Sequence, residues 1–256
     1  MSSFEHSAKH EFDALAPARQ SLYSSLSQAF YAPPVAHPLP PLLNPDFLDA
    51  IGPFVSPRVM NTLRPWAAEA GADDQWASKT KQEFMRLFKV PGEDYVKPYE
   101  SVYRDSREIG KKKVAGLLMG QCATDVKKWY QLAAVEVSGE YQDLHDHIAL
   151  ELNFLSHLCK KEQEFIRARD TVRLRRCREM QRDFLAGHVI KWIGLLRDRI
   201  WEKTNHPYYR GVADFTVDFI NSDLNMLESH LGAASVSSGP PYRETDARAS
   251  TSSCTR

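Results

Sequence analysis

Three histidines and two aspartates lie close together in the segment Asp143–Leu158, DLHDHIALELNFLSHL. Imidazole and carboxylate groups bind metals and transfer protons, so we consider this segment first as a possible site. His145 and His147 point to different faces of a helix, and His157 lies nearly three turns further on, so no pair at i and i+4 exists to hold a metal. Asp146 and His147 are adjacent and do not face each other on a helix, and no nucleophile motif accompanies them. We therefore predict no catalytic residue, no metal site and a protein that is not an enzyme.

The same segment also has a structural interpretation. Asp143 is suited to cap a helix that runs to about Glu164, with Asp146 three positions later in the capping-box position. His147 and Glu151 are one turn apart and can pair. Behind the cap, one buried stripe is expected from Ile148, Leu152, Leu155 and Cys159.

Cysteines and glycines offer no further site. The spacings of the cysteines match neither a CxxC pair nor a common zinc site, so we expect free thiols in a reducing compartment at Cys122, Cys159, Cys177 and Cys254. The glycines form neither GxxxxGK[ST] nor GxGxxG, which gives no indication of phosphate binding.

A second distinctive segment runs from Phe84 to Tyr103, FMRLFKVPGEDYVKPYESVY. Its first residues share one helical face, because Phe84, Leu87 and Phe88 fall at i, i+3 and i+4. Pro91 and Gly92 then end the helix, and Pro98 restricts the approach to Tyr99. Loops are usually polar, so a loop this apolar should contact a core or a partner peptide.

These motifs resemble the TorD/DmsD family of cytoplasmic chaperones for molybdoenzymes. In that family an aromatic-x-x-Leu-Phe helix end leads through a glycine and proline loop to Pro-aromatic-x-Ser-Val-aromatic, followed downstream by an Asp-His pair on an apolar helix. The pattern is present here as Phe84–Tyr103, with Ser101 and Val102 in place, and as Asp146 and His147. The segment AFYAP at 29–33 resembles the family's first helix end, and Phe184, His188 and Trp192 resemble its late helix. On their spacing alone, the last three are expected in the core.

The resemblance implies a role in redox-enzyme maturation. The protein would bind the catalytic subunit of a molybdopterin oxidoreductase and its twin-arginine leader before cofactor insertion and export. The molybdopterin cofactor would belong to the client, with none bound stably by the chaperone. An apolar groove with a polar edge would receive the leader. The implied client-binding residues are Phe84, Leu87, Phe88, Pro98, Tyr99, Ser101, Asp146, His147, Phe30 and Tyr31. A nitrate-reductase-type assembly factor, whose client need not be exported, is the alternative within the family.

Helical spacing occurs along almost the whole chain, and no run alternates with period 2 over the length of a strand. We predict an all-α fold of about eight to ten helices in one domain over 11–231, with a frayed segment at 1–10 and a disordered, Ser- and Gly-rich tail at 232–256. Pro17 is expected in a first helical turn, and the prolines of 29–45 are expected to form an extended linker. The expected helices are 11–31, 46–52, 56–70, 75–89, 111–137 (as one or two), 143–164, 171–203 and 207–231.

Composition sets further limits. The chain has 33 basic and 33 acidic residues, which gives no general attraction to nucleic acid or to anionic membranes. Seven arginines between Arg167 and Arg182 would suit a helical nucleic-acid-binding regulator, but interspersed acids and the absence of aromatic residues favour a solvated helix face. The first residues lack the apolar core of a secretory signal, and no apolar run approaches membrane-spanning length. We expect a cytoplasmic protein, with a monomer and a domain-swapped dimer both open.

Overall fold

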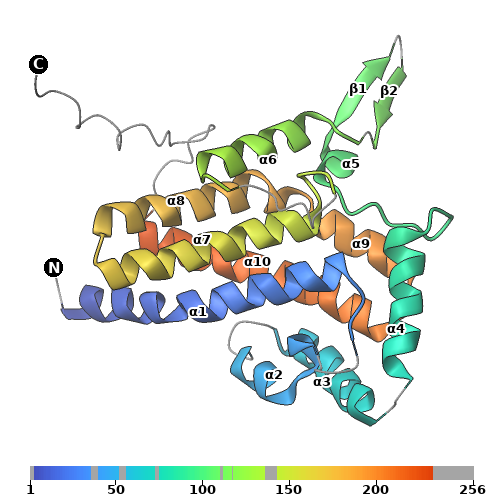
Figure 1. The fold of residues 1–256 in the computed structure, drawn as a ribbon, viewed down its shortest axis with the longest axis horizontal. Coiled ribbons are helices and arrows are strands. Elements are labelled where there is room, and N and C mark those ends of the chain that lie inside the picture. The colour runs from blue at the N-terminus through green and yellow to red at the C-terminus, as the bar shows by residue number, and fades with distance from the viewer. Residues whose placement is uncertain are drawn as a thin grey trace, which may run out of the picture.

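A computed structural model of the chain describes residues 3–35, 40–51, 56–72, 75–109, 112–116, 118–135 and 143–232. The described residues form ten α-helices and one β-hairpin (Figure 1), and the predicted all-α class is confirmed. The helices are α1 (Ser3–Tyr31), α2 (Pro45–Ile51), α3 (Pro57–Ala72), α4 (Trp76–Phe84), α5 (Glu100–Arg104), α6 (Gln121–Leu132), α7 (Ile148–Ala168), α8 (Thr171–Gly187), α9 (Ile193–Lys203) and α10 (Pro207–Leu231).

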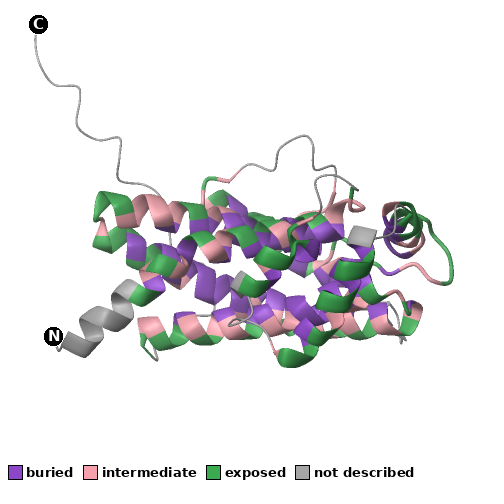
Figure 2. Cartoon of the chain, turned by 90° about the horizontal axis from the view of Figure 1, so that it is seen from below, coloured by how far each residue is buried: buried purple, intermediate pink, exposed green. Residues whose placement is uncertain are grey.

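Four long helices, α1, α7, α8 and α10, form the body of the molecule (Figure 1). Helix α1 lies along α7, and α8 packs against both α7 and α10. The apolar stripe of α1 recurs every fourth residue, and Leu22, Leu26 and Phe30 are each no more than 1 % exposed. Burial of each such side chain stabilises the fold by roughly 1.5–3 kcal/mol. Figure 2 shows the result, with buried residues between the helices and exposed residues on their outer faces.

Helix α1 differs from the prediction at its N-terminal end. It begins at Ser3, whereas residues 1–10 are expected to be frayed, and Pro17 lies inside the helix rather than in its first turn. Residues 3–10 contain neither proline nor glycine, so an established helix extends through them one residue at a time at low cost. An internal proline costs roughly 3 kcal/mol. Packing on both sides of it offsets that cost, since Ala16 and Arg19 are each 0 % exposed.

The proline-rich segment ends α1 at Tyr31 and leads to a short 3-10 turn, Pro41–Leu43. Residues 36–39 of the expected linker lie outside the described residues. Helices α2, α3 and α4 follow close to their expected positions, and α3 packs against α10.

The region after α5 contains a β-hairpin where a helix is predicted. Strands β1 (Ser106–Ile109) and β2 (Lys112–Ala115) pair antiparallel, with Ser106 opposite Ala115. Helix α6 then begins at Gln121, ten residues after the predicted start at Lys111. Strands of four residues show too few alternations for their period to be recognised in the sequence. The start of α6 is fixed from a distance, because the Asp105 carboxylate accepts a hydrogen bond of 3.0 Å from the Cys122 N–H.

The predicted single helix over 171–203 is wrong, since it is divided into α8, a 3-10 turn (Val189–Lys191) and α9. The break falls at His188, whose φ of −119° and ψ of −84° are not helical. Two contacts hold it there. His188 Nδ1 lies 2.9 Å from Glu100 Oε2, and Arg104 donates a hydrogen bond to the Gly187 carbonyl at 2.8 Å. Glycine also has a low helix propensity, which makes this the weakest point of the segment.

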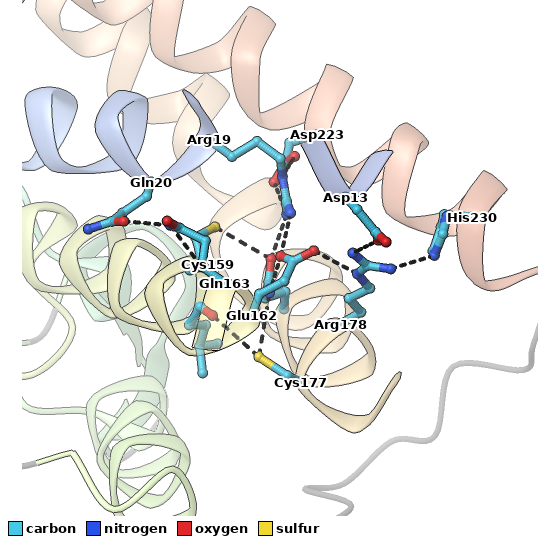
Figure 3. Close-up of polar contacts among 12 residues, drawn as sticks. Asp13, Arg19, Gln20, Cys159, Glu162, Gln163, Cys177, Arg178, Asp223 and His230 are labelled. Carbon is cyan, nitrogen blue, oxygen red and sulfur yellow. Dashed lines mark hydrogen bonds and ion pairs between the residues drawn. The ribbon is translucent and has the colours of Figure 1, made fainter. Parts of the chain in front are cut away.

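A buried ionic network joins the four long helices (Figure 3). Arg19 of α1 contacts Glu162 of α7 at 2.7 Å and Asp223 of α10 at 2.5 Å, and all three side chains are 0 % exposed. Arg178 of α8 contacts the other oxygen of Glu162 at 2.6 Å and Asp13 of α1 at 2.6 Å. Each buried charge therefore has an opposite charge beside it, as burial requires. The burial of Arg178, and of Arg182 at 5 % exposure, removes two members of the arginine run from the surface.

The remaining sequence predictions concern the cysteines, the membrane and the tail. Cys122, Cys159 and Cys177 are free thiols, and burial raises the pKa of Cys177 to about 12. Cys254 and the predicted disordered tail beyond Gly232 lie outside the described residues. No helix in the described ranges is long and apolar enough to cross a membrane.

Candidate functional site

The aromatic end of α4 lies in the core. Helix α4 ends at Phe84 and continues as a π-helical turn, η3 (Met85–Lys89). Phe84, Leu87 and Phe88 are 1 %, 0 % and 4 % exposed. The Phe88 ring lies 6.1 Å from Phe30 of α1 and 5.8 Å from Tyr209 of α10. These side chains hold η3 against the bundle, so the groove expected from Phe84 and Leu87 is not open at the surface.

The loop after η3 joins the two sequence motifs through backbone hydrogen bonds. The Ile148 N–H donates to the Pro98 carbonyl at 2.9 Å, and the Glu100 N–H donates to the Asp146 carbonyl at 3.0 Å. Tyr99 and His147 thereby form an isolated antiparallel bridge. The start of α5 and the start of α7 are consequently held as one unit.

Asp146 caps α5 rather than α7. Its Oδ2 accepts a hydrogen bond of 2.9 Å from the Ser101 N–H, and the side chain is 0 % exposed. The predicted cap of α7 at Asp143 is wrong, because Asp143 accepts a hydrogen bond of 2.6 Å from the Tyr99 hydroxyl. Residues 144–147 form a turn in which the His147 N–H donates to the Leu144 carbonyl at 3.0 Å, and His147 itself is extended in the bridge to Tyr99, so α7 begins only at Ile148.

His147 provides the cap of α7 instead. Its Nδ1 accepts a hydrogen bond of 3.0 Å from the Ala149 N–H, which requires a neutral ring at that nitrogen. Burial lowers the pKa of His147 to about 4, so the ring stays neutral near pH 7. The rings of Tyr99 and Tyr31 lie at 5.2 Å and 6.5 Å from it, edge to face. Both tyrosines are only partly buried, so this aromatic cluster reaches the surface at its edge.

Three carboxyl groups are buried behind the cluster: Glu100, Asp146 and Glu151, each 0 % exposed. Glu100 contacts His188 at 2.9 Å, and Glu151 Oε2 accepts a hydrogen bond of 3.1 Å from Trp192 Nε1. The predicted pairing of Glu151 with His147 is not formed. Burial and the nearby carboxylates of Glu100 and Asp146 raise the pKa of Glu151 well above its ordinary value.

These buried groups do not make a metal site. In the ranges that the structure describes, no three His, Cys, Asp or Glu side chains are arranged to hold a metal ion.

The late-helix residues Phe184, His188 and Trp192 are 0 %, 8 % and 0 % exposed, so their predicted place in the core is confirmed.

An open groove lies on the outer side of the same segment. It has a volume of about 600 Å³ and is formed by α4, η3 and the first residues of the loop. Its exposed apolar side chains are Met85 at 39 % and Val90 at 53 %, with the exposed Pro91 beside them. The residues lining it are Ser78, Lys81, Gln82, Met85, Arg86, Val90, Pro91, Gly92, Glu93 and Asp94.

Charged residues form one edge of this groove. Arg86 contacts Glu83 at 2.5 Å and Asp94 at 2.6 Å, so its charge is already compensated. The side chain of Asp94 is 45 % exposed, and the neighbouring Glu93 is also exposed. The groove therefore combines an apolar floor with an edge of mixed charge, where Lys81 and Arg86 lie beside Glu93 and Asp94.

The structure brings the ten predicted residues together, but mostly as an interior cluster. Ring contacts connect Phe30 to Phe88 and Tyr31 to His147, and hydrogen bonds connect the 98–101 segment to Asp146. Tyr31 and Tyr99 are the only two of the ten that are not buried. Sequence reasoning missed Met85 and Val90. The signal for Met85 was its position off the helical face that Phe84, Leu87 and Phe88 share, and Val90 follows the end of η3.

The comparison with known proteins identifies the family. The sequence model of the nitrate reductase delta subunit family matches residues 56–198, more than half of the chain, including both motifs. The chain belongs to this family, which includes the TorD-like chaperones. The resemblance found in the motifs is thereby confirmed.

Relatives from several bacteria agree with the family match. The chain is 25 % identical over 149 residues to the chaperone protein TorD of Shewanella pealeana, which covers 58 % of this chain and 61 % of that protein. It is 26 % identical over 146 residues to TorD of Vibrio cholerae serotype O1 (strain ATCC 39541), covering 57 % and 61 %. The chain thus spans about three fifths of the length of these relatives. They are named as chaperones rather than enzymes, in agreement with the prediction of a non-enzymatic protein.

Proposed function

We propose that this protein is a cytoplasmic maturation chaperone for the catalytic subunit of a molybdopterin oxidoreductase. It binds the subunit and its twin-arginine leader before the cofactor is inserted and the enzyme is exported. The molybdopterin belongs to the client. The observation that carries the proposal is the η3 groove, defined by the lining residues given above, in a chain whose relatives are named TorD chaperones.

The chemistry of the η3 groove fits a twin-arginine leader. Such leaders carry a charged segment followed by an apolar segment of about 7–15 residues. Met85, Val90 and Pro91 offer apolar surface for the second part, and methionine adapts its shape to different side chains. Glu93 offers an exposed carboxylate for the arginines, which form bidentate charge-assisted hydrogen bonds, while the carboxylate of Asp94 already pairs with Arg86.

In this proposal the buried motif residues hold the loop, α5 and η3 in place and do not contact the client. Asp146 and His147 are 0 % and 2 % exposed, so neither presents a surface to a bound peptide. They fix α5 and the preceding loop to α7, while Phe84, Leu87 and Phe88 fix η3 to the bundle. Tyr31 and Tyr99, at the partly exposed edge, remain candidates for direct contact with the client.

Calorimetric titration tests leader binding. The probe is the leader peptide of the molybdopterin oxidoreductase encoded beside this protein. Wild-type protein should bind it with a negative heat-capacity change, because apolar surface is buried. Met85→Glu with Val90→Glu should weaken binding by about tenfold or more, since charge is placed on the apolar floor.

Leu118→Glu with Leu195→Glu is the matched control, because these leucines are 47 % and 50 % exposed and lie outside the groove. It should change the affinity by no more than about twofold. Equal losses in both double variants, or no binding by a folded wild-type protein, would count against the η3 groove as the leader site.

The family description favours one alternative, a nitrate-reductase-type assembly factor with a client that is not exported. In that case the protein would bind a catalytic subunit that lacks a twin-arginine pair. Replacement of both leader arginines by glutamine separates the two functions. A loss of affinity supports the leader-binding chaperone, and an unchanged affinity supports the assembly factor.

A further inference from the structure

A second groove lies between α7, α8 and the end of α6. Its volume is about 510 Å³. Apolar side chains form its floor, among them Leu158 and Phe165 of α7 and Cys177 and Met180 of α8, with Leu132 at the α6 end. Two antiparallel helices with an apolar furrow between them are the usual seat for an amphipathic helix. We call this the α7–α8 groove.

The rim of the α7–α8 groove is basic. Lys161, Arg173 and Arg176 line it, against Glu164 and Glu179. The end of α7, the turn that follows it and the start of α8 add the exposed Arg167, Arg169 and Arg175, against Asp170. Three basic and two acidic side chains thus line the groove, and three further basic side chains and one acidic one lie close to them in the sequence. This is the exposed part of the arginine run that stands out in the sequence, and leader binding does not use it.

The acidic residues of the rim do not prevent a partner from binding the arginines. Lys161 pairs with Glu164 at 2.9 Å, Arg173 with Asp170 at 2.6 Å and Arg175 with Glu179 at 2.9 Å, each within three or four residues on the helix surface. Exposed pairs of this kind stabilise a helix by only about 0.3–0.5 kcal/mol, so their arginines exchange partners at little cost. Arg167 and Arg169 have no ion pair within the described part of the chain.

We propose that the α7–α8 groove binds an acidic amphipathic helix of a partner protein. Apolar side chains of that helix occupy the floor over Leu158, Phe165 and Met180, and its carboxylates pair with Arg173, Arg176 and the arginines of the turn. The surplus of basic side chains selects the sign of the partner's charge. The apolar floor selects a helix over a nucleic acid, whose backbone would gain nothing from it.

This surface is separate from the η3 groove. In Figure 1 the turn between α7 and α8 lies at the left end of the bundle, and α4 lies at the right end. A leader peptide bound in the η3 groove therefore leaves the α7–α8 groove accessible. The inference holds whether or not leader binding occurs at η3.

Fluorescence anisotropy with a designed peptide tests the inference. The probe is a labelled synthetic helix of about 18 residues, roughly five turns, with leucine on one face and glutamate on the other. Full-length protein should bind it with a Kd of about 1–100 µM. Peptides with lysine in place of glutamate, or serine in place of leucine, should bind about tenfold more weakly or worse. Added salt should weaken the binding of the acidic peptide.

Charge reversal on the protein locates the binding. Arg173→Glu with Arg176→Glu should reduce the affinity about tenfold or more, since both side chains are exposed on the rim. Arg64→Glu with Arg199→Glu is the matched control, because these arginines are 52 % and 47 % exposed on α3 and α9. Its affinity should stay within about twofold of wild type.

Three results would overturn the inference. The first is that the acidic peptide does not bind the folded wild-type protein at millimolar concentration. The second is that both double variants lose affinity to the same extent. The third is that a single-stranded RNA of about 20 nucleotides binds the rim through its phosphates while the acidic peptide does not bind. That third result would assign the arginines to a nucleic acid.

Discussion

Replacement of Glu151 by glutamine should make the free energy of unfolding depend less on pH, because it removes one titrating group from the core. Glu151 is buried with Glu100 and Asp146 nearby, and these neighbours together with burial raise its pKa well above its ordinary value. In the neutral form its hydroxyl can donate to Glu100, while its other oxygen accepts from Trp192. Glutamine keeps both hydrogen bonds, because its amide nitrogen donates and its carbonyl oxygen accepts.

The sign and size of the effect follow from proton linkage. In the unfolded chain the pKa of Glu151 is about 4.3, whereas in the folded protein the side chain keeps its proton to a higher pH. Between those two values the folded state binds one more proton than the unfolded state, so the free energy of unfolding falls as pH rises. The slope is about 1.4 kcal/mol per pH unit for one proton. From pH 5 to 7 the wild type should lose stability relative to Glu151→Gln, by at most about 2.7 kcal/mol, which is two pH units at that slope.

Urea unfolding at several pH values between about 5 and 8 measures this difference. Glu151→Ala should be less stable than Glu151→Gln by roughly 2–4 kcal/mol at every pH, since neither variant titrates at this position and the alanine leaves a cavity and an unpaired Trp192 N–H. Glu69→Gln, at an exposed carboxyl of α3, is the matched control and should give a curve parallel to that of the wild type. Parallel curves for wild type and Glu151→Gln would refute the assignment of a neutral Glu151.

Three further predictions concern the scaffold. Asp146→Ala should lower the stability by roughly 0.5–2 kcal/mol through loss of the α5 cap, and Asp146→Asn should lower it less; equal denaturant midpoints for the two variants would contradict the capping role. Arg19→Met should cost roughly 3–5 kcal/mol, because Glu162 and Asp223 lose a shared buried partner; a loss below about 1 kcal/mol by urea unfolding would show that the network is dispensable. Truncation after Leu231 should leave the melting temperature unchanged within about 2 °C, and a larger fall would show that the tail packs on the body.

Helical periodicity was sufficient to predict most of the fold. The stripes of α1 and α7 repeat over enough turns to be unambiguous, and Leu22, Leu152 and Leu155 are buried as expected. The errors arise where an element is short or where its end is set by distant residues. The hairpin strands have four residues each, and the break between α8 and α9 depends on contacts of Glu100 and Arg104 across the chain.

The sequence predicted which motif residues lie close together but not that most of them are buried, and their role in client binding stays a prediction. The motifs indicated which residues gather, and the structure brings Phe30, Phe88 and His147 into one cluster with their predicted neighbours. Met85 is exposed because it falls outside the helical face that Phe84, Leu87 and Phe88 share, and Val90 is exposed in extended backbone after the end of η3. His147 replaces Asp143 as the cap because of a bridge to Tyr99 that is distant in sequence.

Photo-crosslinking tests the central proposal most directly. A leader peptide with a benzophenone amino acid in its apolar segment is irradiated with the full-length protein, and the attachment site is mapped by mass spectrometry. The account predicts attachment within residues 82–97, at Met85 or Val90 first, and competition by unlabelled leader. Attachment on α7 or α8 near Phe165 and Met180, or labelling that unlabelled leader does not suppress, would contradict binding of the leader in the η3 groove.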